Sequence, residues 1–287
     1  MLKISRNSNS LGYLFVGPAI LFILCLSIYP MINAITISFL DKQGSFVGIN
    51  NFVKAFYDPI FKESSINSIK FVVISVVMHM TLAMALALFF TQSMNYYYRL
   101  IVRTLVLMAW AVPPAIVATI WRIMYNPQLS FMKVIEKLFG GVNFEWALLA
   151  YPNTSLIGIT IANIWFSLPL YMLMMMAALQ TIPKEFYEAA KIDGANAIGR
   201  FLWITLPGIR NILITLATFD LIGSFVIFEL SFIMTGGGPL TSSEVLPTYI
   251  YKVAFTRWDF NYGAAMSVIM FIALLTLSLL LNSLRRD

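Results

Sequence analysis

The sequence is poor in charged residues and in residues that bind metals or act as nucleophiles. Charged side chains make up 11% of its 287 residues, whereas they make up about a quarter of an ordinary soluble domain. Cys25 is the one cysteine, which excludes an intrachain disulfide and a thiolate metal cluster. His79 is the one histidine, so the chain has few of the residues that a metalloenzyme or a Ser-His hydrolase needs. We therefore expect no catalytic residue, no metal site and no cofactor bound by this chain.

Known nucleotide-binding and hydrolytic motifs are also missing from the sequence. No Gly-x-x-x-x-Gly-Lys-Ser/Thr phosphate loop occurs, so the chain is not expected to bind ATP in the usual way. No His-Glu-x-x-His, Cys-x-x-Cys or Gly-x-Ser-x-Gly occurs either. The chain is therefore predicted not to be an enzyme. Any energy that it uses must come from a separate ATPase or from an ion gradient.

Basic residues outnumber acidic residues by 19 to 13, which gives a formal net charge of +6. The basic residues are scattered through the polar stretches, and this argues against nucleic acid as a partner. A protein that faces anionic lipid acquires such a balance, so we expect membrane lipid to be the partner of these charges.

Apolar residues make up 60% of the chain, which argues against a soluble fold. Six apolar stretches are long enough to cross a membrane as helices. These stretches are residues 11–40, 71–92, 100–121, 154–180, 212–235 and 260–284. We predict an all-α, polytopic membrane protein of about six transmembrane helices, which form a single domain over residues 1–287. The first stretch is too long for a signal peptide and has no clean cleavage site, so we expect it to stay uncleaved.

The polar stretches outside the predicted spans have features of their own. Residues 41–69 are predicted to form a loop, and its aromatic residues suit a helix that lies on the membrane surface. Residues 122–153 are predicted to form a second outer loop with an amphipathic piece at residues 131–139. A last outer loop precedes residue 260 and carries aromatic residues that suit a membrane interface.

Helix-breaking and polar residues interrupt the apolar stretches. Pro113 and Pro114 lie in the middle of the third stretch, where they remove two backbone donors and break the hydrogen-bond ladder. Such a break must face protein or a wet cavity, and it can serve as a pivot, line a pathway or be a tolerated kink. The lone His79 among Met, Val and Leu is more typical of a hydrogen bond between helices than of a proton relay.

Two carboxylates, Asp220 and Glu229, lie in the fifth stretch with no lysine or arginine between them. Burying an ionised carboxylate there costs a few kcal/mol. Their spacing of nine residues, at about 100° per residue, puts them on roughly opposite faces, so they are not a catalytic pair. One can line a pathway while the other packs against a partner subunit. Alternatively, a carboxyl group can stay protonated and hydrogen-bonded.

A polar stretch at residues 183–207 has the local chemistry of two short helices joined by a sharp turn. Pro183 suits the first turn of a helix, and Glu185 suits its positive end. Gly194 supplies the left-handed residue that a helix end often requires, and Pro207 closes a second amphipathic segment. On these grounds alone, a surface hairpin that merely joins two spans is as good an interpretation as an element that docks on a partner.

Within this stretch, the sequence resembles the signature loop, or EAA loop, of ABC-importer permeases. The resemblance rests on Glu188-Ala189-Ala190, on Asp193-Gly194-Ala195, on Phe201 and on Ile204-Thr205-Leu206-Pro207. Further segments are similar to carbohydrate-uptake permeases of the maltose and glycerol-3-phosphate type, specifically to the first of their two permease subunits. These segments are residues 46–52, 163–165, 178–180, 234–239 and 249–251. The resemblance covers nearly the whole chain.

The resemblance implies an ATP-driven, binding-protein-dependent importer for a saccharide or a related polyol. This chain would be a transmembrane permease subunit that forms half of the translocation pathway. A second, similar permease, two ATPase subunits that bind ATP and Mg, and an extracytoplasmic solute-binding protein would be its partners. A cytoplasmic coupling-helix hairpin at residues 183–207 would dock on the ATPase. Its implied coupling residues are Glu188, Ala189, Ala190, Asp193, Gly194, Ala195, Phe201 and Pro207.

The fourth and fifth stretches are expected to supply the pathway, where Trp165 and Tyr171 can stack on a sugar ring or simply pack. The residues expected to line it are Asn163, Trp165, Ser167, Tyr171, Phe225 and Glu229. Neither stretch contains an arginine, which favours a neutral or weakly charged saccharide over a phosphate.

The expected location is the bacterial cytoplasmic (inner) membrane, crossed several times, with both termini in the cytoplasm. Placing the 183–207 stretch inside leaves only a weak excess of basic residues on the cytoplasmic side. Two other functions remain open. An ion-coupled secondary transporter would use Asp220 and Glu229 as proton carriers, although six spans without a detectable internal repeat fit it poorly. A membrane scaffold without transport would have no polar residue facing a cavity.

Overall fold

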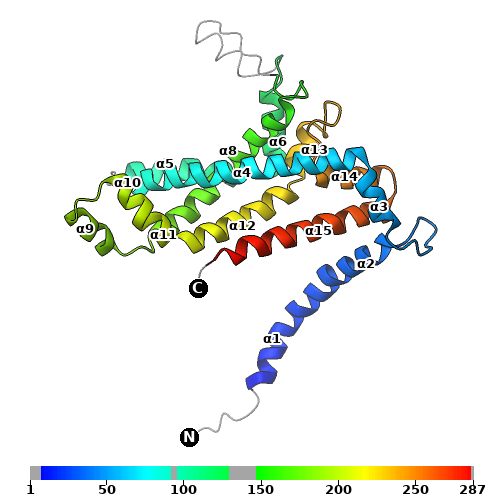
Figure 1. The fold of residues 1–287 in the computed structure, drawn as a ribbon, viewed down its shortest axis with the longest axis horizontal. Helices are drawn as coiled ribbons and strands as arrows, with labels where there is room; N and C mark the ends of the chain where they lie inside the picture. The colour runs from blue at the N-terminus through cyan, green and yellow to red at the C-terminus, as the bar shows by residue number, and fades with distance from the viewer. Residues whose placement is uncertain (1–7, 92–95, 129–146, 286–287) are drawn as a thin grey trace. The chain divides into compact units, whose positions relative to one another are not determined.

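A computed structural model describes residues 8–91, 96–128 and 147–285 of the chain. In these ranges the regular secondary structure is helical, apart from one isolated β-bridge. Five of the described helices are long and apolar enough to cross a membrane, and a further, shorter helix is also apolar. The all-α, polytopic fold is thereby confirmed (Figure 1). The amphipathic piece expected at residues 131–139 lies outside the described residues, as does residue 92, where the second predicted span ends.

The chain divides into two compact units, which we describe separately. The first unit consists of Met1–Asp58 and Ile250–Phe271, and the second consists of Pro59–Tyr249 and Ile272–Asp287. Helix α15, Phe260–Ser283, contributes residues to both units. Its bounds agree with the sixth predicted span to within one residue.

The first predicted span is a nearly continuous helical run in the first unit. Helix α1, Ser8–Ile23, is followed by a π-helical turn, Leu24–Ile28, and by α2, Tyr29–Ser38. The π-helical turn lies just before Pro30, whose missing N–H leaves a carbonyl of the preceding turn without its usual donor. The widened turn is therefore a local response to the proline, as is common where a helix ladder is interrupted.

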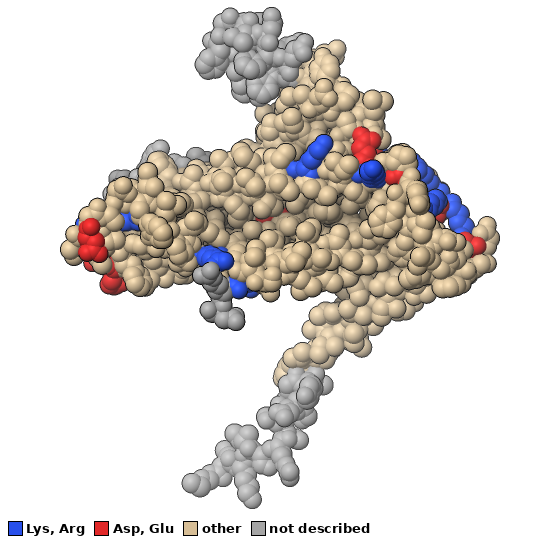
Figure 2. Space-filling model, viewed as in Figure 1, with Lys and Arg blue, Asp and Glu red and all other residues tan. Residues whose placement is uncertain are grey.

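Polar side chains organise the segment that follows α2 in the first unit. A short helix was expected from its aromatic residues, and α3, Asn50–Tyr57, is present there. Asn51 donates from Nδ2 to the carbonyl oxygen of Ser38, the last residue of α2, and to that of Leu40, over 2.9 Å each. The ammonium groups of Lys42 and Lys54 lie 3.4 and 3.7 Å from the carboxylate of Asp259. Figure 2 shows basic and acidic atoms together over this part of the first unit.

Helix α4, Pro59–Thr91, belongs to the second unit and begins twelve residues before the predicted second span. The prediction that residues 41–69 form a loop is therefore wrong for the first eleven residues of α4. Asn67 donates to two carbonyl oxygens of the segment 241–246, and Ser68 Oγ accepts an N–H from the same segment. The polar residues at the start of α4 thus serve a buried contact with a distant loop, which local polarity alone does not reveal.

The third predicted span is divided into two helices at the paired prolines. Helix α5, Tyr96–Trp110, ends before them, and α6, Pro114–Met124, begins after Pro113, as the missing backbone donors require. Tyr125, directly after α6, donates from its phenol to the Gly158 carbonyl oxygen over 3.2 Å. Burial raises the pKa of the Tyr125 phenol, which therefore keeps the proton that it donates.

The fifth predicted span is also divided, although it contains no proline. Helix α12, Arg210–Val226, and α13, Glu229–Met234, are separated by residues 227–228. The inference that Asp220 and Glu229 lie on opposite faces of one helix is therefore wrong, because no continuous helix joins them. The 100° rule applies only within an unbroken ladder.

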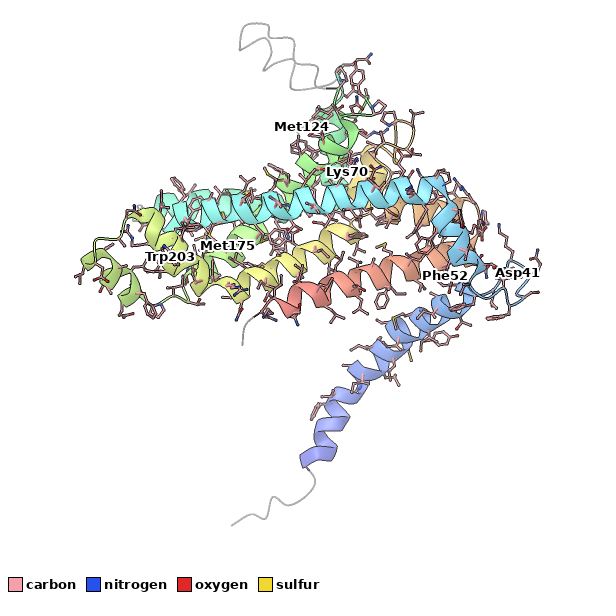
Figure 3. All side chains as sticks on the ribbon, in the orientation of Figure 1. Asp41, Phe52, Lys70, Met124, Met175 and Trp203 are labelled. Atoms are coloured by element: carbon pink, nitrogen blue, oxygen red, sulfur yellow. The ribbon has the colours of Figure 1, made fainter. Side chains whose placement is uncertain are left out.

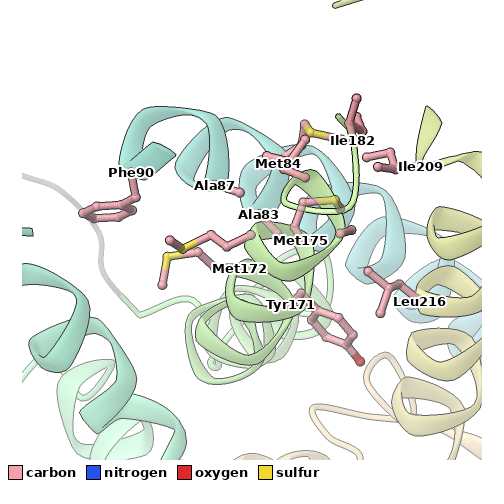
Figure 4. Packing of buried hydrophobic residues seen from close by; sticks show 13 residues of the cluster. Ala83, Met84, Ala87, Phe90, Tyr171, Met172, Met175, Ile182, Ile209 and Leu216 are labelled. Carbon is pink, nitrogen blue, oxygen red and sulfur yellow. The ribbon is translucent and has the colours of Figure 1, made fainter. Parts of the chain in front are cut away.

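Three long helices, α4, α8 and α12, pack against one another in the second unit (Figures 1 and 4). Helix α8, Ser155–Leu179, agrees with the fourth predicted span to within one residue at each end. Its Met172 and Met175 are fully buried in one cluster with Ala83 and Ala87 of α4. The small residues allow the two helices to approach closely, and the flexible methionines fill the space that remains.

Candidate functional site

The stretch predicted to couple to a partner folds into a compact helical hairpin in the second unit. Its first limb is α9, Lys184–Ile192, which has Glu185 in its first turn and Lys191 in its last turn. These charges complement the helix dipole. Pro183 was expected in the first turn of this helix. It is instead the N-cap residue, one position before the first turn. The second limb consists of α10, Ala197–Arg200, the π-helical turn Phe201–Thr205 and α11, Leu206–Gly208.

The turn between the two limbs has a geometry that favours glycine. Gly194 has a φ of +78°, a left-handed conformation that other L-residues rarely adopt. Its N–H donates to Lys191 O over 3.1 Å, and the N–H of Ala195 donates to Ala190 O over 2.8 Å. These two bonds form a Schellman motif. No atom lies within 4 Å of the position that a Cβ would take on Gly194, so backbone strain and not a clash opposes a side chain there.

Side-chain hydrogen bonds hold the two limbs of the hairpin together. Tyr187 Oη and Thr205 Oγ1 lie 3.0 Å apart, and Arg200 donates from Nη1 to a carbonyl oxygen of the turn over 2.6 Å. At the base of the hairpin, Ile182 is buried and lies so close to Gly208 that a Cβ there would meet it at 3.2 Å. The hairpin is therefore one compact element that is packed on the core through Ile182.

Large apolar side chains project from the outside of the hairpin. Ile192 is 86% exposed and Trp203 is 82% exposed, and Figure 3 shows Trp203 at the same end of the second unit as α9. Phe186 and Trp203 both line a hollow of about 450 Å³ between the limbs. Figure 2 shows acidic atoms at α9. An exposed apolar patch with a charged rim is typical of a surface that another protein covers.

The predicted coupling residues differ in exposure within the hairpin. The exposed ones are Glu188, Ala189, Asp193, Gly194 and Pro207, and the half-buried ones are Ala190, Ala195 and Phe201. The buried faces of the last three hold the limbs in place, whereas the exposed residues remain available for contact. The second limb ends at Gly208, so the expectation that Pro207 closes it is wrong by one residue.

A second group of polar residues lies buried between α4, α8 and α12. His79 Nδ1 lies 2.9 Å from Asp220 Oδ2, and His79 Nε2 lies 3.4 Å from the Asn163 carbonyl oxygen. Asn163 donates from Nδ2 to Ser75 Oγ over 3.0 Å, and Ser224 donates to Asp220 Oδ1 over 3.0 Å. All five residues are buried. The prediction that His79 makes hydrogen bonds between helices is confirmed.

Ser75 and Ser224 are functional candidates that the sequence-based prediction missed. Each lies four residues from an ionisable member of the network on its own helix, Ser75 before His79 and Ser224 after Asp220. Residues at this spacing share a helix face, and this is the signal that could have identified them. The ring of Tyr171 stacks on His79 with 5.0 Å between the ring centroids, which closes the network on one side.

The residues predicted to line a pathway differ in exposure. The buried ones are Asn163, Tyr171 and Phe225, Ser167 is half-buried, and Trp165 and Glu229 are exposed. The Trp165 ring meets the edge of Trp121 with a centroid distance of 5.9 Å. Trp165 and Glu229 thus offer an aromatic face and a carboxylate to another molecule. Within the described residues, no group of three or more His, Cys, Asp or Glu side chains could hold a metal ion.

Known proteins resemble this chain over most of its length. The family described as "Binding-protein-dependent transport system inner membrane component" matches residues 80–286. The trehalose/maltose transport system permease protein MalF of Thermococcus litoralis is 30% identical and is matched over 99% of this chain and 98% of its own. The sulfoquinovosyl glycerol transport system permease protein SmoG of Agrobacterium fabrum is 31% identical over 91% of this chain and 85% of its own. A chain of a bacterial ABC transporter involved in the import of the acidic polysaccharide alginate has the same fold, with a TM-score of 0.85, 24% identity, and coverage of 96% of this chain and 94% of that chain.

Proposed function

We propose, because this chain belongs to the family of binding-protein-dependent transport system inner membrane components, that it is the permease subunit of an ATP-driven saccharide importer. Relatives about as long as this chain are permeases named for trehalose and maltose and for sulfoquinovosyl glycerol. A structural neighbour is a transporter bound to a periplasmic protein that carries an alginate pentasaccharide. These substrates share a sugar or sugar-like unit, so a disaccharide, an oligosaccharide or a related polyol is the proposed cargo.

The single observation that carries the coupling role is the hairpin with its exposed apolar side chains. Ile192 and Trp203 of this compact element are exposed, so a partner protein can cover them. Movement of that partner would then move the hairpin. We assign that partner to an ATPase subunit, one of two, which binds ATP and Mg. Closure of the ATPase pair would move the hairpin, rock the attached helices and switch a central cavity between its two openings.

The proposed pathway is shared between this chain and a second, similar permease. Trp165 and Glu229 are the exposed members of the predicted set, so they are the groups proposed to meet the substrate. An aromatic ring suits the apolar face of a sugar, and a carboxylate accepts hydrogen bonds from its hydroxyl groups. Asn163 and Tyr171 are buried, and we assign them a supporting role. An extracytoplasmic solute-binding protein would deliver the substrate.

The chain is an inner-membrane component, and we propose that both termini and the hairpin lie in the cytoplasm. This orientation follows from the proposed contact between the hairpin and a cytoplasmic ATPase. The alternative of an ion-coupled transporter gains no support from the family or from the relatives named above. Asp220, which it would use as a proton carrier, is hydrogen-bonded to His79 and to Ser224.

Affinity purification of the tagged chain from a mild-detergent extract tests the proposed function. We expect an ATPase and a second permease to be recovered with it, and we expect the reconstituted complex to take up saccharide only with ATP. Recovery of a folded chain that moves solute alone along a proton gradient would overturn the proposal.

Matched variants test whether the hairpin binds the ATPase. Trp203→Asp should abolish recovery of the ATPase but not of the second permease. Phe46→Asp removes another exposed aromatic residue, which is 76% exposed and lies in the first unit, and it should leave recovery of the ATPase unchanged. Equal recovery of the ATPase with Trp203→Asp and with the wild type would contradict the docking role.

A further inference from the structure

A cavity of about 700 Å³ lies where the hairpin meets the end of the membrane-spanning helix α8. Leu179, the last residue of α8, is in its wall, together with Thr91 of α4. Arg103 of α5 and Lys184 and Tyr187 of the hairpin complete it. Because the ends of transmembrane helices lie at the depth of the lipid headgroups, the cavity is placed at the boundary between hydrocarbon and water.

The described lining of the cavity contains two basic residues and no acidic residue. The basic residues are Arg103 and Lys184. Neither side chain forms an ion pair with a described carboxylate, whereas Lys42 and Lys54 both do. Two cations that face one cavity repel each other, and an anion between them would relieve that repulsion.

Apolar side chains also form part of the cavity wall. Leu88 and Phe90 come from α4, Leu100 comes from α5, and Leu179 comes from α8. A phosphate or another small inorganic anion would meet the two cations but would leave these apolar side chains uncovered. A molecule with an anionic head and a hydrocarbon tail satisfies both parts of the wall at once.

We propose that this cavity binds an anionic phospholipid of the surrounding membrane. Its phosphate lies between Arg103 and Lys184, and the upper part of its acyl chains covers Leu88, Phe90 and Leu100. Gln180, which also lines the cavity, offers an amide to the glycerol part of the headgroup. Since Lys184 begins α9, the bound lipid contacts the hairpin and the transmembrane helices together. Lipid binding is therefore linked to the position of the hairpin, whatever solute the protein carries.

Native mass spectrometry of the purified full chain in nanodiscs, with any partners that it retains, measures lipid retention directly. The probe is an equal mixture of phosphatidylglycerol, which is anionic, and phosphatidylcholine, which has no net charge. We expect the wild type to retain phosphatidylglycerol selectively. A basic residue near an anionic surface contributes about 1 kcal/mol, so Arg103→Gln and Lys184→Gln should each lower that retention about five-fold. The double variant should lower it roughly twenty-five-fold.

Control variants separate this site from general attraction by positive charge. Arg285→Gln removes an exposed cation that does not line the cavity, and it should leave retention unchanged. The charge-preserving pair Arg103→Lys with Lys184→Arg should retain the lipid. Leu88→Trp, which fills the apolar part of the wall and keeps both cations, should lose it. The melting midpoint and the elution volume of each variant show that it is folded.

Three results would overturn the proposal. The first is equal retention of the two lipids by the wild type. The second is unchanged phosphatidylglycerol retention in the folded double variant. The third is displacement of phosphatidylglycerol by millimolar inorganic phosphate, which would show that the cavity takes a free anion. None of these results depends on recovery of an ATPase, so failure here is distinct from failure of the proposed transport function.

Discussion

At the residue scale, His79 and Asp220 show how an ionisable pair is kept inside a helical bundle. A carboxylate in the middle of a span needs hydrogen-bond donors, and hydrocarbon offers none. Asp220 accepts from two sources, the imidazole of His79 on α4 and the hydroxyl of Ser224 on its own helix. The pair therefore joins α4 to α12, and the Asn163 carbonyl oxygen on the other side of the imidazole extends the connection to α8.

We expect His79 and Asp220 to be energetically coupled. His79→Ala and Asp220→Ala should each destabilise the protein by about 1–3 kcal/mol, because each leaves a buried partner without its hydrogen bond. The double variant should lose less than the sum, since the second substitution removes a group that is already unpaired. Unfolding of the four purified proteins in detergent measures the free energies of this cycle.

Thr160→Ala is the control for that cycle. Thr160 is buried on α8 but bonds to Leu156 O of its own helix. Its effect should add to that of His79→Ala within about 0.5 kcal/mol. If the effects of His79→Ala and Asp220→Ala were also additive, the hydrogen bond between them would contribute nothing to stability.

At the element scale, the hairpin depends on one backbone conformation. Gly194→Val should strain the turn by roughly 1–3 kcal/mol, because a β-branched residue is forced to a positive φ. A turn that is formed for less of the time transmits less motion. We therefore expect saccharide uptake by the reconstituted complex to fall more than its ATP hydrolysis, and the ratio of the two rates is the quantity to measure.

Gly44→Val is the matched control for this substitution. Gly44 has a φ of +83° and nothing within 4 Å of a Cβ, so the strain is similar, but it lies in the first unit. It should leave the ratio of uptake to hydrolysis unchanged. Wild-type coupling in the Gly194→Val protein would remove the turn from the mechanism.

The helices also show which parts of the fold local sequence could predict. Apolar length located α8 and α15 to within one residue, and the paired prolines marked the break between α5 and α6. The break between α12 and α13 has no such mark, because it consists of Ile227 and Phe228 and contains neither proline nor glycine. Tertiary packing decides such a position, and no periodicity within the segment encodes it.

The candidate sites also differ in how far the sequence alone could predict them. The hairpin could be predicted from a continuous stretch, since its cap glycine, its charged first and last turns and its motif all lie within 25 residues, 183–207. The His79 network and the lipid cavity could not. Arg103 and Lys184 are 81 positions apart, and only the folded helices bring them to one wall. Sequence spacing predicts contacts within an element, whereas sites built from several elements need the fold.

At the scale of the whole molecule, the arrangement of the spans predicts on which side of the membrane each loop lies. Two helices long and apolar enough to cross a membrane, α4 and α8, lie between Phe46 and Ile192, and the crossing that we propose for α5 with α6 makes three. In a Cys25→Ser background, a membrane-impermeant thiol reagent should label Ile192→Cys from the cytoplasmic side only and Phe46→Cys from the outer side only. Both positions are exposed, so access is not limited by burial.

Labelling of both positions from one side would contradict this arrangement, because it requires an even number of crossings between them. The Cys25→Ser background itself serves as the blank. Its unlabelled state shows that the signal comes from the introduced thiols.

The bonds between the start of α4 and the segment 241–246 also set an order of events during synthesis. Asn67 reaches its acceptor Thr241 across 174 positions of the chain. At about 5–20 residues per second, a ribosome needs roughly 9 to 35 seconds to cover that distance. Until then the amide of Asn67 and the hydroxyl of Ser68 have no final partners and must stay hydrated. The start of α4 therefore stays hydrated after its synthesis. It forms its final contacts only after the segment 241–246 has been synthesised.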